Sequence, residues 1–136
     1  MKVIKGRASG IASESRTENC SGTVWGDAVL PTTDGVTVNN VFFVPGGRTH
    51  WHVHEHGQLL QIVTGAGWVC AEGGEAEMIR AGDLVWIPPG ERHWHGASAE
   101  SYMIHLAISI GKTSWQEGVS EAQYEAAAQR KARPKS

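Results

Sequence analysis

Turn-forming residues interrupt this chain about every ten residues, and this spacing limits the regular structure that it can form. From residue 22 to residue 110, short segments rich in valine, isoleucine, tryptophan and threonine alternate with turn signals, as at residues 45–47, 65–67 and 88–90. Segments of this length are typical of strands, and no long helical period separates them. We therefore expect an all-β domain of eight or nine strands, a sandwich or a barrel.

The two ends of the chain depart from this pattern. Residues 1–18 are rich in serine, glycine and charge, so we expect a loosely ordered segment there. Residues 120–123 read Ser-Glu-Ala-Gln, which has the form of a capping box, and helix-forming residues follow as far as residue 130. We therefore divide the chain into an N-terminal segment (1–18), a barrel (19–112) and a C-terminal helix with its tail (113–136).

Charge and composition exclude several classes of function. The formal net charge of −2 argues against a nucleic-acid partner, and no apolar run approaches the ~18 residues that span a bilayer. No apolar stretch follows the basic N-terminus, so we expect a cytoplasmic protein with no membrane partner. Cys20 and Cys70 lack a metal-binding or redox spacing, and we expect free thiols.

Histidine is the residue type whose placement points to chemistry. His52 and His54 are two positions apart and therefore share one face of a strand, while Trp51 faces the other way, into an apolar layer. Two imidazoles on one face can supply two ligands to one divalent ion. His93 and His95 share a face for the same reason, and a hairpin-like stack would bring His93 opposite the first pair. Three tryptophans are expected in the core, namely Trp51, Trp86 and Trp94.

Both histidine segments belong to longer motifs punctuated by glycine, Gly46-x5-His52-x-His54-x3-Gln58-x6-Gly65 and Gly82-x5-Pro88-x-Gly90-x2-His93. These resemble the two motifs of the cupin superfamily, whose members are double-stranded β-helix or jelly-roll barrels. The resemblance implies a single cupin barrel here, followed by the short helix. Cupin motifs place three histidines and a carboxylate around a divalent metal. Gln58 stands where the family has glutamate, and its amide oxygen can still bind a hard ion.

A closer resemblance covers about residues 36–124. It is carried by His52-x-His54-x3-Gln58-Leu59, Gly67-Trp68, Gly82-Asp83-x-Val85-Trp86, His93-Trp94-His95-Gly96-Ala97, His105-Leu106-Ala107, Trp115 and Gln123-Tyr124. This set is similar to the bacterial manganese-dependent cupin hydroxynitrile lyases. The resemblance implies a metal held by His52, His54, Gln58 and His93. Manganese is the expected ion, with iron, zinc, nickel and cobalt as alternatives.

The same resemblance implies roles for further residues. His95 matches a histidine that acts as acid and base near the departing cyanide, and His105 matches one in the same pocket. Asn39 and Val41 match positions that line the substrate space, although Asn39 is more polar than the small residue associated with that position. By analogy with the family we expect a small-molecule substrate and a homodimer or homotetramer, since open sheet edges need cover.

Three classes of function fit these residues. Three neutral imidazoles and an amide leave the charge of a divalent ion uncompensated, which makes the ion a stronger Lewis acid. This favours acid–base lyase or hydrolytic chemistry over oxygen activation. The resemblance implies a metal-dependent lyase, similar to hydroxynitrile lyases, that interconverts a cyanohydrin with an aldehyde and cyanide. A metal-dependent dioxygenase would need the same three histidines. A ligand-binding cupin without turnover would use the same pocket.

Overall fold

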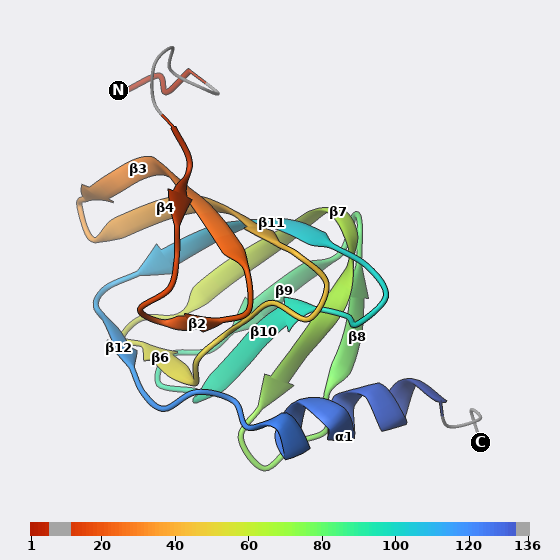
Figure 1. Cartoon of the computed structure of the whole chain (residues 1–136). Coiled ribbons are helices and arrows are strands. Elements are labelled where there is room, and N and C mark those ends of the chain that lie inside the picture. The colour runs from red at the N-terminus through yellow and green to blue at the C-terminus, as the bar shows by residue number, and fades with distance from the viewer. Residues whose placement is uncertain (6–11, 133–136) are drawn as a thin grey trace.

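The computed structural model describes residues 1–5 and 12–132, and within them the expected all-β barrel with a C-terminal helix is confirmed (Figure 1). Five strands are only two or three residues long, which explains why there are more strands than expected. The elements are β1 (Glu14–Ser15), β2 (Cys20–Ser21), β3 (Val24–Thr33), β4 (Val36–Phe43), β5 (Arg48–Thr49), β6 (His52–His54), β7 (Gln58–Ala71), β8 (Glu77–Arg80), β9 (Leu84–Ile87), β10 (His93–Ala97), β11 (Met103–Ile110), β12 (Thr113–Trp115) and α1 (Glu121–Ala132).

Two antiparallel sheets enclose the interior and share strand β7. The first sheet has the order β1-β3-β4-β11-β7-β9. In the second sheet, β10 lies between β7 on one side and β5 and β6 on the other, and β8, β2 and β12 extend this sheet. The first half of β7 pairs with β9 and β11, and its second half pairs with β8 and β10.

The glycines at residues 65–67 do not form the turn that the sequence suggested. Strand β7 continues through them and passes from one sheet to the other. Gly65 has a φ of +84°, and a Cβ atom there would lie 1.9 Å from the carbonyl oxygen of Tyr102. Glycine therefore permits a close approach between β7 and the start of β11, where a bulge between Ile104 and His105 also shifts the register.

Two apolar clusters stabilise this arrangement. The first lies inside the barrel and includes Phe43, Leu60, Ile62 and Met103. The second joins α1 to the outer face of the second sheet and contains the expected core residues Trp51 and Trp94, together with Trp68, Val119, Tyr124 and Ala127. Trp86 does not lie in the core, since it is 54% exposed on β9. The expectation for Trp86 was wrong because alternation along β9 places Ile87, and not Trp86, inside.

The helix α1 begins where the capping box predicted. The Gln123 backbone N–H donates to Ser120 Oγ at 3.1 Å, and the Ser120 N–H donates to Gln123 Oε1 at 2.9 Å. Arg48 of β5 pairs with Glu121 at 2.9 Å and lies over the Tyr124 ring. These contacts attach the helix to β5, which pairs with the histidine-bearing strand β10. Residues 133–136, which end the predicted tail, lie outside the described residues.

The N-terminal residues from 12 onward run along the barrel. Strand β1 pairs with β3, and β2 pairs with β5. The division at residues 18 and 112 stays a prediction, and residues 6–11 of the first segment lie outside the described residues. Cys20 and Cys70 are both free. Within the described residues, no helix has the length and apolar character needed to cross a membrane.

Candidate metal centre and pocket

Four strands place five histidines and one glutamine at one end of the barrel interior. Strand β6 carries His52 and His54, and β10 carries His93 and His95. His93 is the register partner of His52, as the hairpin-like stack predicted. Gln58 begins β7, and His105 comes from β11. All six side chains are buried.

Hydrogen bonds to the backbone fix which ring nitrogen is free. His52 Nδ1 lies 2.8 Å from the carbonyl oxygen of His50, and His93 Nδ1 lies 2.9 Å from that of Glu91. A carbonyl oxygen only accepts, so each Nδ1 carries the proton and each neutral ring presents a lone pair at Nε2. His54 Nδ1 lies 3.0 Å from Thr113 Oγ1, a hydroxyl that can accept the ring proton and leave the His54 Nε2 lone pair free. Hydrogen bonds of this kind to the outer ring nitrogen commonly orient histidines that bind metals.

The Nε2 atoms of three of the histidine rings face the interior without protein partners. Those of His52, His54 and His95 are buried and make no hydrogen bond. His93 Nε2 lies 3.2 Å from Gln58 Oε1, while Gln58 Nε2 donates to Ser109 Oγ at 3.1 Å. The Gln58 oxygen and the His93 lone pair are both acceptors, so a cation between them would satisfy both. The donor set therefore fits a metal ion.

Burial keeps these imidazoles neutral, as metal ligands must be. Burial lowers the pKa of His54 to about 4, helped by the neighbouring His93, and it lowers the pKa of His105 to about 4. The pKa values of His52, His93 and His95 are also lowered, chiefly by burial. For His52 and His95, mutual repulsion with other imidazoles adds to this effect.

A second grouping of ligands overlaps the predicted one. The candidate ligand atoms of His52, His93 and His95 all lie within 4.8 Å of one another. His52 and His93 are common to both sets, whereas His95 was predicted to act in catalysis. The ring centroids of His54 and His93 are 5.4 Å apart, so His54 borders the same space. The ligand set of His52, His54, Gln58 and His93 stays a prediction.

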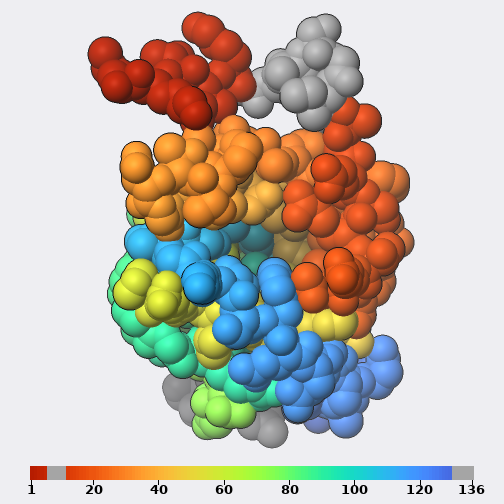
Figure 2. Space-filling model, turned by 90° about the vertical axis from the view of Figure 1, so that its left-hand side faces the viewer, coloured from red at the N-terminus to blue at the C-terminus, as the bar shows by residue number. Residues whose placement is uncertain are grey.

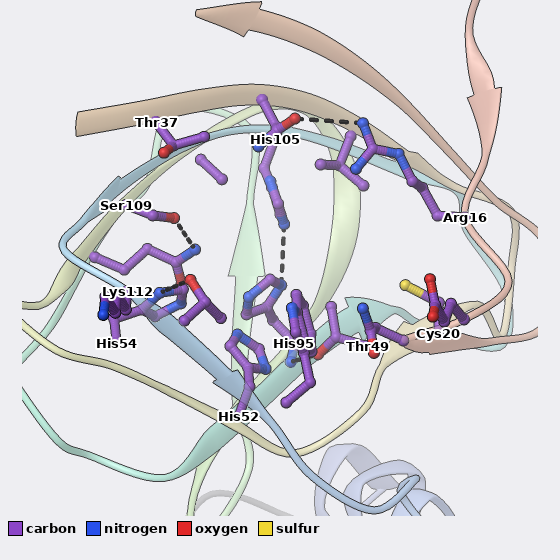
Figure 3. A pocket seen from close by; sticks show the side chains of 18 of the residues that line it. Arg16, Cys20, Thr37, Thr49, His52, His54, His95, His105, Ser109 and Lys112 are labelled. Carbon is purple, nitrogen blue, oxygen red and sulfur yellow. Dashed lines mark hydrogen bonds between the residues drawn. The ribbon is translucent and has the colours of Figure 1, made fainter. Parts of the chain in front are cut away.

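His95 and His105 form a coupled pair beside this centre. His105 Nε2 lies 3.0 Å from His95 Nδ1, so one proton links the two rings (Figure 3). The backbone N–H of His95 donates to Thr49 Oγ1 at 3.2 Å, and the Phe43 ring packs against His105. The outer nitrogen of His105, Nδ1, is buried without a partner. His95 is thereby fixed with its Nε2 directed away from His105.

The histidines open into a cavity of about 1000 Å³. Asn39 and Val41 line it, together with Phe43 and Ala107. In Figure 2 its mouth is the hollow below β3 and β4 (orange), between residues 12–21 (red-orange) and the segment that contains β12 (blue). A small molecule can therefore enter from solvent and reach the histidines.

Sequence reasoning missed several residues of the site. Ser109 and Thr113 orient Gln58 and His54, and inward alternation on β11 could have identified Ser109. Thr49 supports His95. Arg16 also lines the cavity, but it comes from the segment expected to be loosely ordered, where no periodicity marked it.

A barrel that buries histidine side chains in this way defines a metal-binding cupin, and comparisons with known proteins agree. Residues 40–109 match the family described as "Cupin domain", and the chain belongs to the cupin family. Over 110 residues it is 46% identical to an (R)-mandelonitrile lyase from Granulicella tundricola, covering 76% of this chain and 84% of that protein.

Solved structures share the fold. A cupin-like protein from Thermotoga maritima superposes with a TM-score of 0.82 at 32% identity, covering 89% of this chain and 97% of the other. The polyketide cyclase RemF from Streptomyces resistomycificus has a TM-score of 0.70 at 20% identity, covering 91% and 92%. The likeness to RemF concerns the fold alone.

Proposed function

We propose that this protein is a metal-dependent lyase that cleaves small α-hydroxynitriles into an aldehyde and cyanide. The observation that carries the proposal is the set of buried imidazole Nε2 atoms that face one cavity without protein partners. The 46% identity to an (R)-mandelonitrile lyase supports the choice of reaction.

We infer that His52, His54, Gln58 and His93 hold the divalent ion, with manganese preferred over iron, zinc, nickel or cobalt. When bound, such an ion supplies Lewis-acid polarisation of a substrate oxygen. The neutral donor set supports this chemistry, because no carboxylate among these four residues offsets the charge of the ion. Gln58 is held for the task by its hydrogen bond to Ser109.

His95 is the proposed acid and base. Its Nε2 is buried at the cavity and unpartnered, so it can accept the hydroxyl proton of the substrate as the C–CN bond breaks. The same nitrogen can return that proton to the departing cyanide, which balances the reaction. This requires His95 Nδ1–H to donate to His105 Nε2, the atom pair that lies 3.0 Å apart. His105 therefore holds the reactive tautomer of His95.

The remaining pocket residues are proposed to bind and shield the substrate. Asn39 and Val41 project from neighbouring positions of one face of β4 and line the cavity. Phe43 and Ala107 complete an apolar wall near His105. A wall of this kind excludes water and strengthens the electrostatic interactions inside.

Elemental analysis followed by an assay with mandelonitrile tests the proposal. We expect one equivalent of a divalent metal, release of benzaldehyde followed by its absorbance, loss of activity on chelation, and recovery with Mn²⁺. Metal-loaded protein that releases no benzaldehyde above the background rate would refute the lyase assignment. Consumption of O₂ with a phenolic or diketone substrate would indicate the dioxygenase class, and binding without turnover would indicate a ligand-binding cupin.

We also propose that two copies pair through the outer face of the first sheet. Trp25, Val63, Leu84 and Trp86 are large apolar side chains, each at least 41% exposed, on strands β3, β7 and β9 of this sheet. Large exposed apolar side chains on one sheet support an interaction site at this face. Sedimentation should show a homodimer or homotetramer. Leu84→Glu should dissociate it, whereas Glu125→Lys on the exposed side of α1 should not.

A further inference from the structure

A guanidinium group from the N-terminal segment forms part of the cavity wall. Arg16 follows β1, and its backbone N–H donates to the carbonyl oxygen of Val24 at 2.8 Å. Its side chain lies against Gly26 of β3, where a Cβ atom would come within 2.5 Å of Arg16 Nε. The absence of a side chain at Gly26 therefore makes room for the guanidinium.

The Arg16 guanidinium lines the cavity, and not all of its N–H donors have a partner. Its Nη2 donates to Asn39 Oδ1 at 3.3 Å, which links it to a residue of the proposed substrate space. Its Nε is buried and makes no hydrogen bond. Figure 3 shows Arg16 on the opposite side of the cavity from His54, with His105 between them. The guanidinium thus borders the part of the cavity remote from the candidate ligands.

Within residues 1–5 and 12–132, no carboxylate lies at ion-pair distance from Arg16. Glu14, Glu18 and Glu55 also line the cavity, but all three are exposed to solvent. The nearby thiol of Cys20 stays neutral, because burial raises its pKa to about 11. A partly buried guanidinium without a counter-charge is an energetic cost that an anionic ligand would offset.

We propose that Arg16 determines substrate specificity by binding a carboxylate at the end of the substrate remote from the reacting hydroxyl. The preferred substrates are then hydroxynitriles of aldehydes that carry a carboxylate. This inference rests on the proposed function, because it assigns a substrate class to the same pocket. The planar fork of arginine matches a carboxylate in geometry as well as charge. Asn39 accepts a hydrogen bond from Arg16 Nη2 and thereby orients this fork.

Calorimetric binding to the full-length, Mn²⁺-loaded protein tests the proposal without requiring turnover. The probes are benzaldehyde and its carboxylated forms, 3- and 4-formylbenzoate. We expect at least one formylbenzoate to bind the wild type about tenfold or more tightly than benzaldehyde, as a charge-assisted contact provides. In Arg16→Gln this ratio should fall towards one. Metal content and the melting temperature verify that the variant is folded and loaded.

Two further variants keep the test decisive. Lys112→Gln removes an exposed cation that also lines the cavity, and it should retain the ratio. Arg16→Lys keeps the charge but loses the fork, so its ratio should be intermediate. The proposal is overturned if neither formylbenzoate binds the wild type more tightly than benzaldehyde does. It is also overturned if the tighter binding persists in Arg16→Gln, which is the result expected if the metal binds the carboxylate. Equal loss in Lys112→Gln would also overturn it.

A turnover measurement separates this proposal from the lyase assignment. The cyanohydrin of the preferred formylbenzoate should exceed mandelonitrile in kcat/KM in the wild type, and the ratio should collapse in Arg16→Gln. If mandelonitrile is cleaved but Arg16→Gln leaves the ratio intact, only the role of Arg16 fails. If neither cyanohydrin is cleaved while formylbenzoate binding still depends on Arg16, only the lyase assignment fails.

Discussion

The two ends of the barrel interior are built by the same strands from opposite kinds of side chain. On β10, His93 and His95 face one end and Ala97 the other, and all are buried. Strand β7 begins with Gln58 at the polar end and continues with Leu60 and Ile62 at the apolar end. The inward-facing residues of the same alternating strands therefore form a binding centre at one end and a hydrophobic core at the other.

The two ends contribute to stability with opposite signs. Apolar burial at the Leu60 end favours folding by about 25 cal/mol per Å² removed from water. At the histidine end, several buried nitrogens have no partner, and each such group costs free energy until a ligand satisfies it. Burial of apolar side chains at the Leu60 end and under α1 thus offsets the free-energy cost of the unpartnered nitrogens at the histidine end.

Removal of a ligand shared by both candidate sets should have the largest effect. His52→Ala and His93→Ala each delete a lone pair that faces the centre, so we expect loss of stoichiometric metal and of lyase activity. Elemental analysis of the purified variants measures this. His56→Ala is the matched control, because its side chain is 64% exposed. Full metal occupancy in the first two variants would contradict the assignment of the centre.

His95→Ala should affect turnover and not metal content. If His95 is the acid and base, we expect kcat to fall by about 10²–10⁴-fold with one equivalent of metal retained. Parallel measurement of metal content and benzaldehyde release distinguishes the two sets of ligands. Loss of metal in this variant would instead place His95 in the three-histidine group with His52 and His93.

Acid should destabilise the metal-free protein through its polar end. The pKa values of His54 and His105 are lowered from 6.5 to about 4 in the folded chain, so only the unfolded chain takes up their protons between these pH values. Stability is therefore full above pH 6.5 and is lost progressively as the pH falls towards 4. Denaturant unfolding of metal-free protein at a series of pH values measures this. A midpoint independent of pH over this range would contradict it.

Much of the centre could be predicted because its residues obey local rules. The two-residue spacing of His52 and His54 fixed their common face on β6, and Ser120 with Gln123 marked the start of α1. The turn predicted at Gly65 was wrong, because glycine occurs both in turns and in strands that pass close to another backbone. The distinction depends on Tyr102, which is distant in sequence. Arg16 was missed for the same reason, because only its fit against Gly26 brings it to the cavity.

At the apolar end, Leu60→Ala should lower the free energy of unfolding by about 2–5 kcal/mol, because the side chain is fully buried among apolar neighbours. The variant should still bind one equivalent of metal, which would separate the core from the centre. Denaturant unfolding and elemental analysis measure the two quantities. Val3→Ala, at 73% exposure, is the control and should cost far less. Loss of metal with little loss of stability in Leu60→Ala would mean that the two ends are not independent.

Removal of an orienting partner should produce the smallest effect, confined to the polar end. Ser109→Ala frees the amide of Gln58, and Thr113→Val frees Nδ1 of His54, while every candidate ligand remains. Such outer partners typically contribute about 10–100-fold to metal affinity. Competition with a chelator should reveal a loss of this size in each variant. An unchanged affinity in Ser109→Ala would show that Gln58 does not bind the ion, whereas the same result in Thr113→Val would exclude His54. The two variants therefore distinguish the predicted set of four ligands, which includes His54 and Gln58, from the three-histidine group. Neither His54 nor Gln58 belongs to the three-histidine group.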